Sequence, residues 1–267
     1  MLKNITIGQY FPGDSSIHKL DPRIKIISVI LYIAALFFMD KFIYYIPAII
    51  LLTSTILVAK LPFKYIIKGL KPIFILIIIT FLINTFMTPG EIAFEIGPIT
   101  ATKEGLRQAS FMAIRLILLV LCTTVLTLTT SPILLTDGIE KLLNPFKRIG
   151  LPAHELAMMM TIALRFIPTL LEETDKIMKA QMARGADFES GNIIKRAKNL
   201  IPLLVPLFIS AFRRADELAM AMEARCYRGG ENRTRMRELE LKRFDIVFLI
   251  IVLIYLILII LFRYFIN

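Results

Sequence analysis

The sequence has very few of the residues that usually build redox, metal or disulfide sites. Its 267 residues include two cysteines, Cys122 and Cys226, and two histidines, His18 and His154. Cys122 lies in an apolar run and Cys226 in a charged segment, so we expect free thiols rather than a disulfide. The histidines are far apart in the sequence, and we expect no metal site.

Common motifs of phosphate-binding, zinc-dependent and redox catalysis are also absent. The sequence contains no G-x-x-x-x-G-K-[ST] phosphate loop, no H-E-x-x-H helix and no C-x-x-C pair. The apolar runs have no Asp, Glu or His in their interiors, whereas proton-coupled carriers and intramembrane enzymes need such groups at depth. Arg115 is the exception, and we expect it to snorkel from the outer end of a span without a functional role. We therefore expect a non-enzymatic chain without a cofactor of its own.

Apolar residues, in contrast, are abundant. Hydrophobic residues make up 57% of the chain and the mean hydropathy is +0.71, whereas soluble proteins contain about 45–50% apolar residues. Five runs approach the roughly 20 residues of a transmembrane helix, at 24–39, 42–59, 72–87, 112–130 and 246–262. The first 22 residues lack the apolar core of a signal peptide, so we expect no cleavage there. The predicted fold is an all-α polytopic membrane protein.

The positive charge favours a membrane partner over a nucleic acid. The formal net charge is +11 and the pI is about 9.7, but the basic residues cluster beside the apolar runs, where anionic headgroups attract them. Four lysines without an intervening acid follow the second run, and three glutamates follow the third: Lys60, Lys64, Lys68 and Lys71, then Glu91, Glu95 and Glu104. Since basic loops stay inside, we expect the lysine loop to be cytosolic.

This orientation predicts the domain organisation in the cell membrane. A cytosolic N-terminal segment, 1–23, precedes four spans within 24–130. A cytosolic helical domain, 131–243, then leads to a last span within 244–267, whose end lies outside. The connector at the end of the helical domain mixes Arg, Lys and Glu, and we expect it to be solvated or to face lipid headgroups.

The expected cytosolic domain contains three helices. Ser131-Pro132 is typical of a helix start and predicts a short helix to about Leu143. A second helix begins at Pro152 and stops at Gly185, with apolar residues at helical spacing. A third spans about 192–225, and its two prolines, at 202 and 206, should bend the first half.

The second and third helices end alike. One ends in Ala183-Arg184-Gly185 and the other in Ala224-Arg225-Cys226, and an aspartate stands nine residues before each arginine (184 − 175 and 225 − 216). A single arginine at a helix end usually serves the helix dipole. Two in matched contexts favour docking to a partner, because the planar guanidinium suits carboxylates and backbone carbonyls.

Methionines gather in the same helices. Each one alone is as well explained by core packing, but as a set flexible thioethers suit a surface that accepts several partners. Both interpretations stay open for Met158, Met159, Met160, Met178, Met182, Met220 and Met222.

Together with two N-terminal segments, Tyr10-Phe11-Pro12-Gly13-Asp14-Ser15 and Leu20-Asp21-Pro22-Arg23-Ile24-Lys25, these helix ends resemble the T component (EcfT/CbiQ type) of energy-coupling factor (ECF) ABC transporters. The resemblance covers nearly the whole chain. It implies a scaffold whose two arginine motifs dock onto two ABC ATPase subunits, which bind the ATP. An exchangeable substrate-binding S component would pack against the same helices and take up a vitamin or micronutrient.

By that analogy Arg184 and Arg225 are the docking residues, and Ala183, Gly185, Ala224 and Cys226 are their small neighbours. The family usually has glycine where this chain has Cys226. Because cysteine disfavours the left-handed cap conformation, we expect the third helix to run on towards Gly229-Gly230.

Two other classes of function compete with this interpretation. A conventional ABC permease, forming its own translocation path, would carry E-A-A-x-x-x-G followed by I-x-L-P in its coupling loop. Glu223-Ala224-Arg225 begins in that way, but no such proline motif follows before Arg243. A membrane enzyme or ion-coupled carrier is disfavoured by the lack of acids and histidines inside the spans.

Overall fold

The computed structural model describes residues 10–96, 99–188, 192–229 and 239–266. The chain divides into two compact units. Of the described residues, those at 10–138 and 239–266 form the bundle unit, and those at 139–229 form the hairpin unit.

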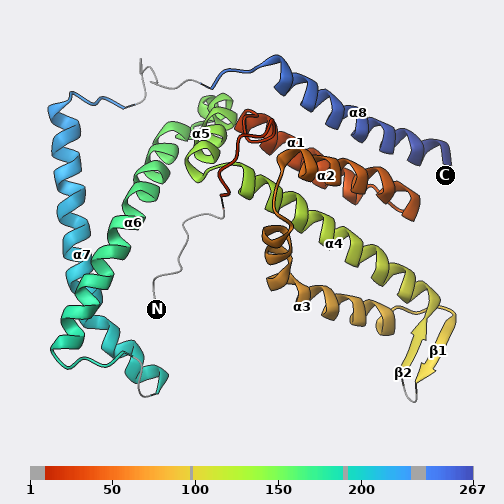
Figure 1. Ribbon diagram of the computed structural model, residues 1–267, viewed down its shortest axis with the longest axis horizontal. Coiled ribbons are helices and arrows are strands. Elements are labelled where there is room, and N and C mark those ends of the chain that lie inside the picture. Colours follow the sequence, from red (N-terminus) through yellow and green to blue (C-terminus); the bar gives the residue numbers. More distant parts are fainter. Residues whose placement is uncertain (1–9, 97–98, 189–191, 230–238, 267) are drawn as a thin grey trace. The chain divides into compact units, whose positions relative to one another are not determined.

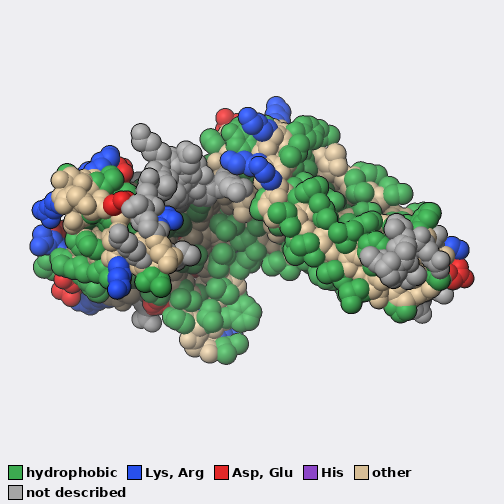
Figure 2. Space-filling model, turned by 90° about the horizontal axis from the view of Figure 1, so that it is seen from below, with side chains coloured by type: hydrophobic (Ala, Val, Ile, Leu, Met, Phe, Trp, Pro, Cys, Tyr) green, Lys and Arg blue, Asp and Glu red, His purple; other side chains and the backbone are tan. Residues whose placement is uncertain are grey.

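The bundle unit contains five long helices (Figure 1). They are α1 (Pro22–Phe37), α2 (Tyr45–Ala59, preceded by the 3-10 turn η1, Phe42–Tyr44), α3 (Phe63–Met87), α4 (Lys103–Thr129) and α8 (Arg243–Ile266). Their shared core includes Leu36, Tyr45, Ala48 and Leu128, which are at most 2% exposed. The outer faces remain apolar, and hydrophobic side chains dominate the visible surface of these helices in Figure 2. Such faces suit a lipid solvent.

Five helices of the described chain are long and apolar enough to cross a membrane, namely Phe42–Ala59, Phe63–Met87, Lys103–Thr129, Ala153–Ala183 and Arg243–Arg263. Four of them match predicted spans and confirm a multi-pass membrane protein. The remaining helix, Ala153–Ala183 in the hairpin unit, is the least apolar of the set. The predicted first span corresponds to α1, whose 16 residues cover about 24 Å at roughly 1.5 Å per residue, less than a typical hydrocarbon core.

Two helices begin well before the spans predicted within them. α3 starts at Phe63, so Pro72 lies inside the helix instead of starting it. α4 starts at Lys103, which places Arg115 in the fourth turn of the helix. The guanidinium of Arg115 donates to the carbonyl oxygen of Met39 at 3.1 Å and lies 5.4 Å from the ring centre of Phe37. Arg115 therefore binds the C-terminal end of α1.

The acidic loop contains a small antiparallel hairpin that the sequence analysis did not predict. β1 (Ile92–Ile96) pairs with β2 (Ile99–Thr102), with Ile92 opposite Thr102 and Ile96 opposite Ile99. The carboxylate of Glu104 accepts the backbone N–H of Glu91 at 2.8 Å and so ties the hairpin to α4. All other regular secondary structure in the described chain is helical, as predicted.

The three predicted helices beyond residue 131 are present. They are α5 (Pro132–Leu143), followed by the 3-10 turn η2 (Asn144–Ile149), α6 (Ala153–Ala183) and α7 (Ile193–Ala224). Pro202 and Pro206 lie inside α7, and Figure 1 shows its first turns at an angle to the remainder. In Figure 2 the surface of α6 and α7 mixes Lys, Arg, Asp and Glu with hydrophobic residues. Residues 230–238 of the predicted connector lie outside the described residues.

Candidate functional site

The hairpin unit is built on two antiparallel helices, α6 and α7. Near its middle, Glu173 of α6 accepts hydrogen bonds from Arg214, at 2.9 Å, and from the Ser210 hydroxyl, both on α7. At one end, Tyr227 follows α7 and its hydroxyl contacts the sulfur of Met158, near the start of α6, at 3.1 Å. Residues late in α7 thus contact residues early in α6.

This arrangement places the two arginine motifs at opposite ends of the helix pair. Asn199 of α7 donates to the carbonyl oxygen of Asp187, just beyond Arg184. From Asn199 to Arg225 the chain runs 26 residues (225 − 199), almost all in α7, or roughly 40 Å at ~1.5 Å per residue. One partner surface of ordinary size would not reach both motifs, so the geometry suits two separate docking sites.

The end of α6 is a Schellman motif. Gly185 has φ +87°, its N–H donates to the carbonyl of Met182 at 2.9 Å, and the N–H of Ala186 donates to that of Gln181 at 3.0 Å. This pair of bonds is the usual way to satisfy the last carbonyls of a helix. Ala183 is the last helical residue and Arg184 is the C-cap.

The end of α7 has the same geometry with cysteine in the glycine position. Cys226 has φ +56°, its N–H donates to the carbonyl of Glu223 at 2.8 Å, and the N–H of Tyr227 donates to that of Met222 at 3.0 Å. The helix ends at Ala224, so the predicted run towards Gly229 is wrong. The left-handed conformation costs a non-glycine residue about 1–2 kcal/mol, and the two cap hydrogen bonds together with the contacts of Tyr227 offset that cost.

Both motif arginines project freely. Arg184 and Arg225 are exposed, and within the described part of the chain no hydrogen bond or ion pair involves their guanidinium groups. Each guanidinium therefore keeps five N–H donors for an external acceptor. Beside Arg225, the thiol of Cys226 is exposed, whereas Cys122 is buried in the bundle unit.

Tyr227 is held by a contact chain that the sequence analysis missed. Its hydroxyl lies 3.5 Å from Nε2 of His154, and Nδ1 of His154 lies 3.1 Å from a carboxylate oxygen of Glu140. These contacts connect the residue after the second motif to the start of α6 and to α5. In the sequence His154 is an isolated histidine, because nothing near it indicates a partner 73 residues away.

The seven methionines of α6 and α7 differ in exposure. Met159, Met160, Met182 and Met220 are exposed, whereas Met158, Met178 and Met222 are partly buried. The exposed apolar surface of α7 includes more than its methionines, since Phe208 and Phe212 are 60% and 68% exposed. The α7 surface is thus broadly apolar, and the contact surface predicted for the methionines stays a prediction.

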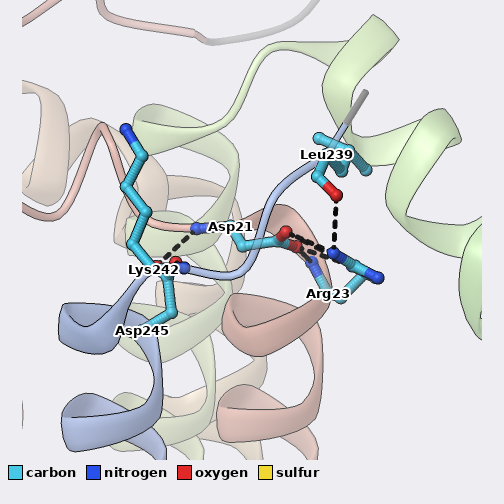
Figure 3. A network of polar contacts seen from close by, with 5 residues as sticks. All are labelled: Asp21, Arg23, Leu239, Lys242 and Asp245. Carbon is cyan, nitrogen blue, oxygen red and sulfur yellow. Dashed lines mark hydrogen bonds and ion pairs between the residues drawn. The ribbon is translucent and has the colours of Figure 1, made fainter. Parts of the chain in front are cut away.

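In the bundle unit, the N-terminal motif residues form a polar network with the last span (Figure 3). The carboxylate of Asp21 accepts the N–H of Arg23 at 2.8 Å, which caps α1, and pairs with the guanidinium of Arg23 at 2.8 Å. Asp245 accepts the backbone N–H of Asp21 at 2.9 Å through one oxygen and that of Lys242 at 2.7 Å through the other. Arg23 also donates to the carbonyl of Leu239 at 3.1 Å. One buried carboxylate, Asp245, thus joins the N-termini of α1 and α8.

Lys25 and His18 complete the N-terminal attachment. The buried ammonium of Lys25 donates to the carbonyls of His18 and Thr129, at 3.2 and 2.9 Å, and to the hydroxyl of Thr130 at 3.1 Å. The ring of His18 lies between the carbonyl of Phe11, at 3.0 Å from Nε2, and the hydroxyl of Ser15, at 2.6 Å from Nδ1. Burial lowers the pKa of His18, and nearby Lys25 lowers it further. The motif therefore fastens the N-terminal segment to α1 and to the end of α4.

Comparison with known proteins gives one consistent result. Residues 13–236 match the family described as CbiQ, cobalt transport protein. The chain is 61% identical over 246 residues to the energy-coupling factor transporter transmembrane protein EcfT of Thermosediminibacter oceani, with 92% of each chain covered. It is 64% identical over 249 residues to EcfT of Clostridium kluyveri, again with 92% of each covered, and 52% identical over 240 residues to EcfT of Bacillus subtilis, with 90% of this chain and 91% of the relative covered.

Proposed function

Because this chain belongs to the CbiQ/EcfT family and is the transmembrane T component of an energy-coupling factor transporter, we propose that it couples two ABC ATPase subunits to a substrate-binding membrane subunit. ATP would be bound and hydrolysed by the ATPases, and this chain would act without catalysis. The exchangeable S component would bind the vitamin or micronutrient. A conventional permease is disfavoured, since the chain resembles transporter membrane components of the EcfT kind along nine-tenths of its length.

One observation carries the proposal: two exposed arginines occupy equivalent positions in two Schellman caps at opposite ends of one helix pair. Each guanidinium is the projecting cation of a rigid helix end, which suits insertion into a groove with acidic or carbonyl acceptors. In this proposal Arg184 docks on one ATPase and Arg225 on the other. The small neighbours Ala183, Gly185, Ala224 and Cys226 let the groove approach the helix end closely.

We further propose that the hairpin unit and the N-terminus are cytosolic, where ATPases reside. The lysines at 60–71 stand at the start of α3 and the acidic hairpin at 91–104 follows its end, which supports this orientation. The exposed apolar surface of α7, with Phe208, Phe212 and Met220, would then receive the S component. Movement of the two ATPases would shift the ends of α6 and α7 relative to each other and so reorient that subunit.

Substitution of the two arginines tests the docking. Arg184→Ala and Arg225→Ala should each weaken ATPase co-purification and uptake, and the double variant more so, while membrane insertion is unchanged. Losing a charged contact at a largely desolvated interface costs about 2–5 kcal/mol, a loss of tens to thousands of fold in affinity. Arg→Lys should not restore full coupling, because an ammonium lacks two parallel donors.

Cys226 provides a second test in the unmodified protein. Its thiol is the exposed one of the chain's two cysteines, so a maleimide should label it in the isolated chain, and bound ATPases should protect it. Labelling of Cys226 at the same rate in the assembled transporter would exclude this helix end from the interface. Full pull-down and transport by the double Ala variant would refute the docking of both ends.

A further inference from the structure

A row of lysines at the turn between α2 and α3 forms no ion pair within the described part of the chain. Lys60 is the C-cap residue of α2, and Lys64, Lys68 and Lys71 follow in the first turns of α3. All four are exposed, and none is in an ion pair with another described residue. The sequence contains no Asp or Glu between Asp40 and Glu91.

The lysines of α3 lie on the side of the helix that faces away from α4. At about 100° per residue, positions 64, 68 and 71 fall within roughly 60° of one another. The opposite side is packed: Ile66 is 5% exposed, and a Cβ on Gly69 would come within 2.8 Å of the Thr124 side chain on α4. The ammonium groups are therefore directed out of the bundle unit.

This arrangement is electrostatically unfavourable for the isolated chain. Like charges three and four residues apart on a helix repel each other by about 0.2–0.5 kcal/mol per pair, and cations in the first turns oppose the helix dipole. Lys60 also adopts a left-handed conformation, φ +52°, that a residue with a Cβ rarely adopts. A bound anion would relieve the first two of these costs.

The surroundings of the row indicate which anion it binds. Phe63 and Ile67 flank the lysines on one side and Tyr65 on the other, all more than 40% exposed. The exposed face then continues into the apolar span with Phe74, Ile75 and Ile78. Cations at the end of a span, flanked by aromatic and aliphatic side chains, match the level of lipid phosphates. We propose that residues 60–71 form a binding site for the phosphate groups of anionic phospholipids and discriminate against zwitterionic lipids.

The absence of tryptophan from the chain permits a direct test. Phe63→Trp places a sole tryptophan beside the row, and its fluorescence can be quenched by brominated phosphatidylglycerol or brominated phosphatidylcholine in otherwise identical mixed vesicles. One lysine near an anionic surface favours association about fivefold. We therefore expect an apparent local enrichment of the anionic lipid of at least about fivefold. The enrichment should decline at molar salt, because the Debye length becomes shorter.

Matched variants make the test specific. Lys64→Gln/Lys68→Gln/Lys71→Gln should abolish the preference, whereas Lys147→Gln/Arg148→Gln/Lys198→Gln, which removes the same charge from exposed positions of the hairpin unit, should leave it intact. A tryptophan introduced instead by Ile251→Trp, on the exposed face of α8, should report equal quenching by both lipids.

Two results would overturn the proposal directly. One is equal quenching of the Phe63→Trp variant by the two lipids, and the other is a preference that survives the first triple substitution. If the Lys64→Gln/Lys68→Gln/Lys71→Gln variant keeps the lipid preference but no longer binds a partner subunit, the lysine row is a protein-binding site and the proposal is also overturned.

Discussion

At the scale of single residues, the two arginine caps differ at the left-handed position, which is glycine in one and cysteine in the other. Gly185 has open space where a Cβ would stand, so its value lies in its backbone alone. Cys226 adopts nearly the same conformation with a side chain attached. The two caps are equal in geometry but unequal in strain.

Exchanging these residues should change stability in opposite directions. We expect Cys226→Gly to stabilise the chain by about 0.5–1 kcal/mol, the relief of left-handed strain less the entropy that glycine adds to the unfolded state. Gly185→Ala should destabilise it by about 1 kcal/mol. Thermal unfolding of the purified chain, followed by helical circular dichroism, measures both. Shifts of the same sign in the two variants would contradict this account of the caps.

A pH effect follows from His18. Its folded pKa lies below the usual 6.5 because of burial, so near pH 6 the unfolded segment binds more protons than the folded one, and stability rises with pH. The contribution of neutral His18 is complete above about pH 6.5 and is lost as the pH falls through the folded pKa. Hydrogen exchange of residues 10–20, corrected for intrinsic rates, should show protection weakening as the pH falls below the usual 6.5. The same dependence in His18→Gln would assign the effect to another group.

At the scale of helices, substitution of Asp245 should destabilise the bundle unit more than substitution of an exposed acid. In Asp245→Asn one of the two backbone donors, from Asp21 or Lys242, faces an amide N–H instead of an oxygen, at a cost of about 1–3 kcal/mol for a buried unsatisfied group. Asp40→Asn is the matched control, because Asp40 forms a half-exposed pair with Arg263 at 2.9 Å that is worth under about 1 kcal/mol. Denaturation of both variants in one detergent gives the comparison. Equal destabilisation would remove Asp245 from its assigned role.

The helices were predictable from the sequence where a local signal exists. Ser131-Pro132 and Gly185 mark helix ends by chemistry that acts within a few residues, and α5 and α6 begin and end close to these positions. The contacts of Asp245 and Tyr227 were not predictable, since their partners lie 224 and 73 residues away. The prediction for the end of α7 was wrong for a different reason. The rule that cysteine avoids the left-handed region is statistical, and the tertiary contacts of Tyr227 override it.

At the scale of the whole molecule, the orientation of the spans is the prediction on which the proposed function depends. In a background of Cys122→Ala and Cys226→Gly, a cysteine at Glu95 should react with an impermeant thiol reagent added outside intact cells, and one at Asp187 should be protected until the membrane is opened. The asymmetry of Lys and Glu around α3 gives this direction. The reverse pattern, or protection at both sites, would exclude a cytosolic hairpin unit.

The carboxylate shared by α1 and α8 has a consequence for biogenesis. Asp21 and Asp245 are separated by 224 residues, and at about 5–20 residues per second a ribosome needs on the order of 10–45 s to make that stretch. During this interval the first helix has been translated without the acceptor that its cap residue uses in the finished protein. The first span is therefore in the membrane before its contact with the last span can form. A chain truncated before residue 245 never forms this contact, and we expect quality-control proteases to degrade it.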